Sequence, residues 1–158
     1  MMERKPGSND PLAQLYRDAI RRHAANPVGY RQAIAATHRH EEYNPLCGDR
    51  IEIALRIENH HVESAAFDGE ACAICLASAS LLCSLAPGEP VSRMTALGNE
   101  LQRALRGDEA SAPRSSRMNP LPQELRPLLG VRPYPSRVRC ATLPWEAAAN
   151  AVADSDVT

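Results

Sequence analysis

The chain is poor in aromatic residues, has no excess of basic charge and contains no long hydrophobic run. Aromatic side chains make up 4% of the sequence, which argues against stacking platforms for single-stranded nucleic acid. Lys and Arg number 18 against 19 Asp and Glu, a formal charge of −1, so no basic surface for a nucleic acid backbone is expected. No window approaches the roughly 18 apolar residues of a membrane-spanning helix. We therefore expect no nucleic acid and no membrane among its partners.

Signatures of export and of several enzyme classes are also absent. The opening residues, MMERKPGSND, contain no apolar stretch of the kind found in secretory signals, so a cytoplasmic location is expected. No glycine-rich phosphate loop and no nucleophile-elbow motif appears, which leaves hydrolase and nucleotide-enzyme functions unsupported. The cysteines number five, an odd count, and in a reducing cytosol we expect them to be buried, catalytic or metal-bound thiols.

The composition is that of one folded domain. The 158 residues have a mass of 17.2 kDa, with 44% apolar and 23% charged residues, enough for a modest single core. We expect a flexible tail over residues 1–9, a single domain over 10–153 and a second tail over 154–158. Within the domain, residues 107–120 have loop composition and are expected to form a mobile insertion.

Hydrophobic periodicity predicts an α+β fold, in which a small antiparallel sheet of about three strands packs against several α-helices. Apolar and charged residues alternate from Ile51 to Glu58, which predicts a half-buried strand. Asn59-His60 predicts a hairpin turn, with the returning strand over 61–67, and residues 33–40 are a candidate edge strand. Helices are expected over 11–25 with Asp10 as the cap, 72–86, 91–106 with a break near Gly98, 123–129 and 136–153.

Three cysteines lie where the chain presents side chains outward. Cys47 falls in a turn, Cys72 at a strand-to-helix junction and Cys140 early in the last helix. Asp49 follows Cys47 by two residues, so one carboxylate and three thiolates form a ligand set suited to tetrahedral zinc or iron–sulfur chemistry. The separations of the three cysteines match no local zinc-finger spacing. At the start of a helix, Cys72 is also expected to have a lowered pKa.

Other interpretations of these residues remain open. Cys72 and Cys75 form a C-x-x-C at a helix start, the setting of a dithiol redox site. Cys75 and Cys83 share an apolar helix face, where a buried inert thiol is the simpler interpretation. His38 and His40 lie on one face of a possible strand and are either a metal-binding pair or ordinary surface residues. A structural zinc module without sulfur chemistry is a third function.

Three separated motifs, in order, carry a resemblance to a known family. They are NPLCGD at 44–49, FDGEACAI at 67–74 followed by ASAS at 77–80, and Cys140. Together with the opening helix they resemble the U-type iron–sulfur cluster scaffold family, which includes IscU, SufU and the amino-terminal domain of NifU, over about residues 11–150. The segment PSRVRCATLPW at 135–145 and the extra stretch over roughly 107–127 look most like the SufU subgroup. Where IscU-like members have a histidine before the third cysteine, this chain has Arg139.

The resemblance implies a SufE/NifU-like fold and a function in iron–sulfur cluster assembly. It implies that Cys47, Asp49, Cys72 and Cys140 bind zinc, or a transient 2Fe–2S or 4Fe–4S cluster. Cys47 would accept persulfide sulfur from a pyridoxal-phosphate cysteine desulfurase, leaving zinc when the desulfurase supplies a replacement ligand. The protein would then be a zinc-dependent sulfurtransferase or a non-enzymatic scaffold, and would serve a downstream iron–sulfur carrier or apo-proteins. Arg137 matches a family arginine near the site.

The chain departs from the family pattern next to these ligands. Ala71 stands where a glycine usually precedes the second cysteine, and it is expected to be strained if its φ is positive. Pro144 is expected to kink the final helix or to set its start.

Overall fold

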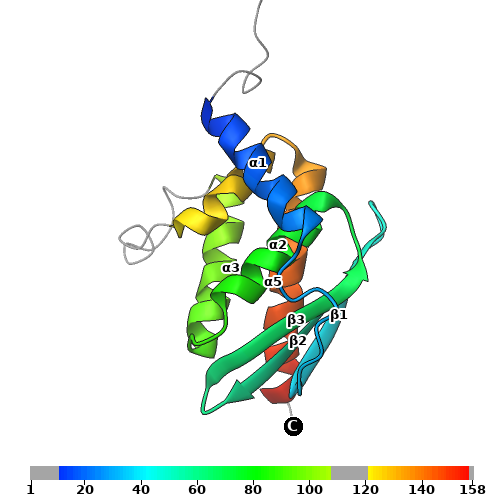
Figure 1. The fold of residues 1–158 in the computed structure, drawn as a ribbon, viewed down its shortest axis with the longest axis vertical. Helices are drawn as coiled ribbons and strands as arrows, with labels where there is room; N and C mark the ends of the chain where they lie inside the picture. Colours follow the sequence, from blue (N-terminus) through cyan, green and yellow to red (C-terminus); the bar gives the residue numbers. More distant parts are fainter. Residues whose placement is uncertain (1–10, 108–120, 157–158) are drawn as a thin grey trace, which may run out of the picture.

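The computed structural model describes residues 11–107 and 121–156. Its elements follow one another as helix, sheet, then helices (Figure 1): α1 (Pro11–Ala25), β1 (His38–Asn44), β2 (Asp49–Glu58), β3 (His61–Glu70), α2 (Ala73–Leu85), α3 (Val91–Arg106), the 3₁₀ helix η2 (Gln123–Val131) and α5 (Pro135–Asp156). This confirms the predicted α+β fold. Residues 108–120, most of the expected insertion, and the cap Asp10 lie outside the described residues.

The three strands form one antiparallel sheet in the order β1-β2-β3. The side chains of Ile51, Ile53 and Leu55 on β2 are fully buried, as expected of a strand whose alternate residues face a core. Helix α5 packs against β1 and β2, and α2 packs against β3. Helices α5 and α2 therefore lie against the sheet, and α1, α3 and η2 pack on these two helices (Figure 1).

The predicted two-residue turn between β2 and β3 is confirmed, but the second strand of the hairpin is longer than predicted. Asn59 and His60 both have positive φ, 52° and 64°, as a two-residue primed turn requires. β3, however, continues past Phe67 to Glu70. Gly69 allows this, because a Cβ at that position would lie 2.1 Å from the carbonyl oxygen of Arg50 on β2. The edge strand β1 also begins at His38 and ends at Asn44, later than predicted.

The helices differ from the predictions in three places. The predicted break near Gly98 is wrong, since α3 is continuous from Val91 to Arg106. A Cβ at Gly98 would come within 3.3 Å of the Trp145 Cβ on α5. Glycine at this position therefore serves close packing of α3 on α5. The 3₁₀ helix η2 extends to Val131. Helix α5 begins at Pro135 and reaches Asp156, beyond the predicted end at Ala153, so Pro144 lies inside it and does not set its start.

Helix α1 is attached to α2 through a hydroxyl. Ser80 is fully buried on α2, and its Oγ accepts a hydrogen bond from the Val28 N–H at 2.8 Å. The hydroxyl proton is then available to Nδ1 of His23, 2.7 Å away. Burial, with a smaller contribution from Arg22, lowers the pKa of His23, because both disfavour the charged imidazole. The neutral ring is the form that holds α1 in place.

This contact predicts a pH dependence of stability. Because the pKa of His23 is lower in the folded chain than its ordinary 6.5, its contribution is complete above about pH 6.5 and is lost as pH falls through the folded pKa. We expect the free energy of unfolding to fall between pH 7.5 and 5.5, and to fall less in His23→Gln. Urea unfolding at a series of pH values measures this, with exposed His60→Gln as the control. Equal slopes in wild type and His23→Gln would contradict it.

Candidate metal centre

Three of the four predicted ligands meet in space. One ligand atom each from Cys47, Asp49 and Cys140 lie within 4.8 Å of one another. They come from the turn between β1 and β2, the first residue of β2 and the second turn of α5. Cys47 is exposed, whereas Asp49 and Cys140 are buried. The group therefore has one accessible thiol and two enclosed ligands.

The turn that carries Cys47 is built by Asn44 and Gly48. The buried Asn44 accepts the Leu46 N–H at 3.1 Å with its side-chain oxygen and the Gly48 N–H at 2.8 Å with its main-chain oxygen. Gly48 has a φ of 77°, which glycine adopts without steric cost. These hydrogen bonds close the turn and leave the side chain of Cys47 exposed on its surface, as the NPLCGD composition predicts.

Asp49 is the buried anchor of the site. Its Oδ1 accepts the Cys72 N–H at 2.8 Å, while Oδ2 is buried and has no hydrogen-bond partner. Burial acts to raise the pKa of this carboxyl, but the nearby Cys140 thiol and the Cys72 N–H favour the ionised form more strongly, so the pKa lies below its ordinary value. A buried carboxylate oxygen without a partner is costly, and a cation bound between the thiols would satisfy it.

The two sulfur atoms of the group have a spacing that suits zinc. Sγ of Cys47 lies 3.7 Å from Sγ of Cys140. Zn–S bonds of about 2.3 Å in a tetrahedral site place two sulfur ligands about 3.8 Å apart. Two thiols at this spacing beside an unpartnered carboxylate oxygen are a donor set that fits a zinc ion.

Cys72 lies next to this group but outside it. It is the N-cap residue of α2, as predicted, and it is half-buried. Its thiol interacts with the Asp49 carboxylate and with the Cys140 thiol, yet its sulfur is not among the ligand atoms that meet within 4.8 Å. The expected lowering of its pKa is wrong, because burial raises the pKa of the Cys72 thiol despite the helix N-terminus.

The remaining cysteines are enclosed in the core. Cys75 is fully buried and Cys83 nearly so. Burial raises the pKa of both thiols, that of Cys83 to about 12, so neither is a ready nucleophile. Cys75 does lie in the first turn of α2 after Cys72, as a dithiol site requires, but its burial counts against reaction with an external partner.

The candidate histidine pair lies on β1, and Arg137 and Arg139 lie on α5. His38 contacts the Thr37 hydroxyl and His40 contacts Glu42, and neither belongs to the metal-binding group found in the described part of the chain. Arg137 is exposed and lies three residues before Cys140 on α5, on neighbouring positions of the helix surface. Arg139 forms an ion pair with Glu146 at 3.3 Å. Ala71 is not among the residues with positive φ, so the expected strain is absent there.

Comparison with known proteins places the chain in a family. Residues 15–120 match the family model of the NifU-like N terminal domain. The chain belongs to this family. It is 30% identical over 148 residues to the zinc-dependent sulfurtransferase SufU of Bacillus subtilis, covering 94% of this chain and 96% of that protein. It is 29% identical over 144 residues to the iron–sulfur cluster assembly scaffold protein IscU of Streptococcus pyogenes, covering 89% and 84%.

Solved structures share the fold of this NifU-like chain. The amino-terminal part of a nitrogen-fixing NifU-like protein from Brucella abortus has a TM-score of 0.78 at 20% identity, covering 93% of this chain and 98% of that one. A putative iron–sulfur cluster assembly scaffold protein for the SUF system from Fervidobacterium islandicum has a TM-score of 0.72 at 21% identity, covering 87% and 96%. At these identities the similarity establishes the fold.

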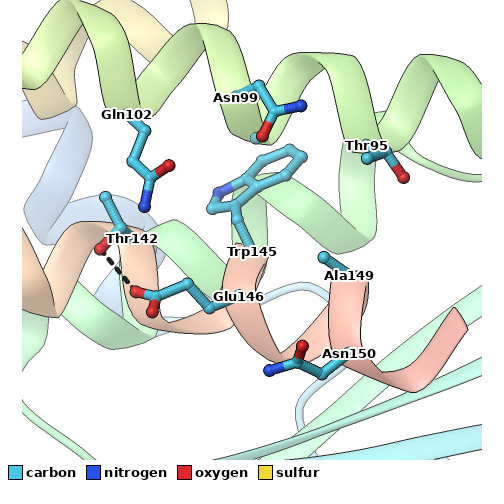
Figure 2. Close-up of a pocket in the computed structure, with 9 residues that line it drawn as sticks. Thr95, Asn99, Gln102, Thr142, Trp145, Glu146, Ala149 and Asn150 are labelled. Carbon is cyan, nitrogen blue, oxygen red and sulfur yellow. Dashed lines mark hydrogen bonds between the residues drawn. The ribbon is translucent and has the colours of Figure 1, made fainter. Parts of the chain in front are cut away.

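Two exposed apolar side chains and one pocket of the NifU-like chain could not be predicted from its sequence. Leu46, next to Cys47 in the turn, is 90% exposed, and Tyr134, just before α5, is 60% exposed. A separate pocket of about 210 Å³ lies between α3 and α5, with Asn99, Trp145 and Glu146 among its lining residues (Figure 2). None of the candidate ligands lines that pocket. Among the described residues, no helix is long and apolar enough to span a membrane.

Proposed function

We propose that this chain functions in iron–sulfur cluster assembly as a zinc-binding sulfur acceptor of the SufU type. Cys47, Asp49, Cys72 and Cys140 are the proposed ligands for zinc or for a nascent cluster. The observation that carries the proposal is the buried, unpartnered Oδ2 of Asp49 beside two thiols whose sulfurs are 3.7 Å apart. Membership of the NifU-like family supports the same chemistry.

Cys47 is the proposed sulfur acceptor because its thiol is the most exposed of the three proposed cysteine ligands. Cys47 is exposed, whereas Cys140 is 2% exposed. Zinc, when bound, keeps thiols ionised at neutral pH and prevents them from pairing. The Cys47 thiolate attacks the outer sulfur of a persulfide on the donor enzyme. A new S–S bond forms on Cys47, the donor's S–S bond breaks, and the donor cysteine leaves as a thiolate.

Asp49 is proposed as the exchangeable ligand. A carboxylate is a harder and weaker ligand for a soft metal site than a fourth thiolate would be. Its Oδ1 is already used by the Cys72 N–H, which leaves Oδ2 as the ligand atom. A site of three thiolates and one carboxylate therefore exchanges ligands more readily than a site of four thiolates.

The proposed partners are a pyridoxal-phosphate cysteine desulfurase as sulfur donor and an iron–sulfur carrier or apo-proteins as recipients. The donor persulfide has to reach Cys47 in the β1–β2 turn. Leu46 is the neighbouring residue and is almost fully exposed, so it is the side chain that a docked donor covers first. Burial of one leucine side chain stabilises a complex by about 1.5–3 kcal/mol.

The size of the hydrophobic core argues against the alternative function of a structural zinc module. Buried residues from the sheet and from α2, α3, η2 and α5 form one hydrophobic cluster. A chain with such a core keeps most of its fold without metal, whereas small structural zinc domains unfold. Sulfur transfer or cluster assembly is therefore the better supported function.

Metal analysis of protein purified without oxygen tests the ligand set. We expect about one zinc per chain and no acid-labile sulfide in wild type, loss of zinc in Cys140→Ser, and unchanged zinc in Cys83→Ser, which removes a core thiol outside the ligand set. Iron with matching sulfide, lost in Cys140→Ser, would instead identify a cluster scaffold. Wild-type protein with neither metal would refute both functions.

Replacement of Asp49 tests its role as the exchangeable ligand. We expect Asp49→Cys, which supplies a fourth thiolate, to retain zinc more tightly and to accept sulfur from the desulfurase more slowly than wild type, because a thiolate is a softer and stronger zinc ligand than a carboxylate. Single-turnover formation of the Cys47 persulfide, followed by mass spectrometry, measures the rate. A rate equal to that of wild type would rule out a labile carboxylate ligand.

Substitution of Leu46 tests the docking of the donor. Leu46→Ser is expected to raise the desulfurase concentration needed for half-maximal sulfur transfer by about tenfold, since about 1.4 kcal/mol is a factor of ten, with zinc content unchanged. Leu15→Ser is the matched control, because Leu15 is an exposed leucine, 58% accessible, on α1. Equal effects of the two substitutions, or none from Leu46→Ser, would show that the turn does not dock the donor.

A further inference from the structure

A buried hydroxyl joins the two helices that carry cysteine ligands. Ser78 of α2 is fully buried, and its Oγ donates a hydrogen bond to the main-chain oxygen of Ala141 at 2.5 Å. The same Oγ accepts the indole N–H of Trp145 at 3.1 Å. Ala141 and Trp145 both belong to α5, and both are buried. The hydroxyl therefore uses its donor and its acceptor on α5, in a buried environment whose low dielectric strengthens both bonds.

Helix α5 contains a proline, Pro144, in the turn that follows Cys140, and this residue removes one main-chain hydrogen bond of the helix. Pro144 lies inside α5 and has no N–H, so it cannot donate to the carbonyl of the residue four positions earlier, which is Cys140. The main-chain turn that carries this cysteine thus lacks one of its helical hydrogen bonds. The hydrogen bond from Ser78 to Ala141, the residue after Cys140, attaches this turn of α5 to the neighbouring helix α2 instead.

The contact lies between two of the proposed ligands. Cys72 is the N-cap of α2, six residues before Ser78, and Cys140 directly precedes Ala141 on α5. The indole of Trp145 lies between α5 and α3 (Figure 2), and Gly98 of α3 lies so close that a Cβ there would come within 3.3 Å of the Trp145 Cβ. Any shift of α5 along α2 changes the separation of the two thiols.

We propose that Ser78 is a positioning residue for the metal centre: its hydroxyl, held between the Ala141 oxygen and the Trp145 indole, sets the separation of the Cys72 and Cys140 thiols. The inference rests on the proposed function, in which these thiols are ligands. Metal–ligand distances in a well-formed site lie within about 0.2 Å of their standard values, so the ligand atoms have to be held at matching separations. Loss of the hydroxyl therefore changes metal binding even where the fold is retained.

Ser80 provides a matched control on the same helix. It is also fully buried, and its hydroxyl also has two partners, Val28 and His23. Those partners belong to α1 and the segment after it, not to α5. Ser78→Ala and Ser80→Ala thus remove equivalent buried hydroxyls from α2, and only the first removes the link to α5.

The experiment measures zinc affinity by competition with a chromophoric chelator, on purified full-length protein, and records the visible spectrum of the cobalt-substituted protein. Both variants are expected to lower the urea midpoint of the metal-free protein. Ser78→Ala is expected to weaken zinc binding about tenfold, the lower end for residues that support metal ligands, and to shift the cobalt bands. Ser80→Ala is expected to leave affinity and spectrum as in wild type.

A milder variant keeps the test decisive if Ser78→Ala does not fold. Trp145→Phe removes the indole N–H together with the five-membered ring that carries it but keeps the bond from Ser78 to Ala141, and it is expected to weaken zinc binding in the same direction but by less. Wild-type affinity and spectrum in Ser78→Ala, or in Trp145→Phe when it is used instead, would overturn the positioning role, as would equal loss in Ser78→Ala and Ser80→Ala. Wild-type protein that binds no zinc would overturn the proposed function and this inference with it.

Discussion

The hydrogen bond from the Cys72 N–H to the Asp49 carboxylate, 2.8 Å long, joins the first residue of β2 to the N-terminus of α2. The rest of the site depends on it, because it fixes a buried charge at the point where the turn, the sheet and two helices meet. One carboxylate oxygen is used in this bond and the other remains without a partner. A buried polar atom of this kind costs stability, and a cation bound beside it would offset that cost.

Helix α2, which begins after Cys72, packs against both α1 and α5. Most of its residues are buried, and several of them are Ala or Ser, whose small side chains allow neighbouring helices to approach closely. Its two buried serines bond in different directions, Ser80 to the α1 region and Ser78 to α5. The helix that begins at Cys72 is thereby held against two neighbours by directional bonds as well as by apolar packing.

The five thiols differ in chemistry because their surroundings differ. Cys47 lies at the surface of a turn, Cys140 and Cys72 border the carboxylate of Asp49, and Cys75 and Cys83 lie within the core. Desolvation disfavours thiolates away from a cation, so the enclosed thiols are unreactive unless a metal is bound beside them. An accessible thiol beside protected ones is the arrangement that a sulfur acceptor needs.

The features that could be predicted from the amino-acid sequence are local. The alternation along β2, the Asn59-His60 turn and the NPLCGD turn depend on residues close in the chain, so their patterns predicted them, and three motifs in order predicted the family. The tertiary structure alone decided what depends on distant contacts. Gly98 packs closely on Trp145 of α5, burial overrides the helix N-terminus at Cys72, and Ser78 bonds to α5. The 3.7 Å approach of Cys47 to Cys140 across 93 residues required the packed core, because no local pattern encodes a distance between separate elements.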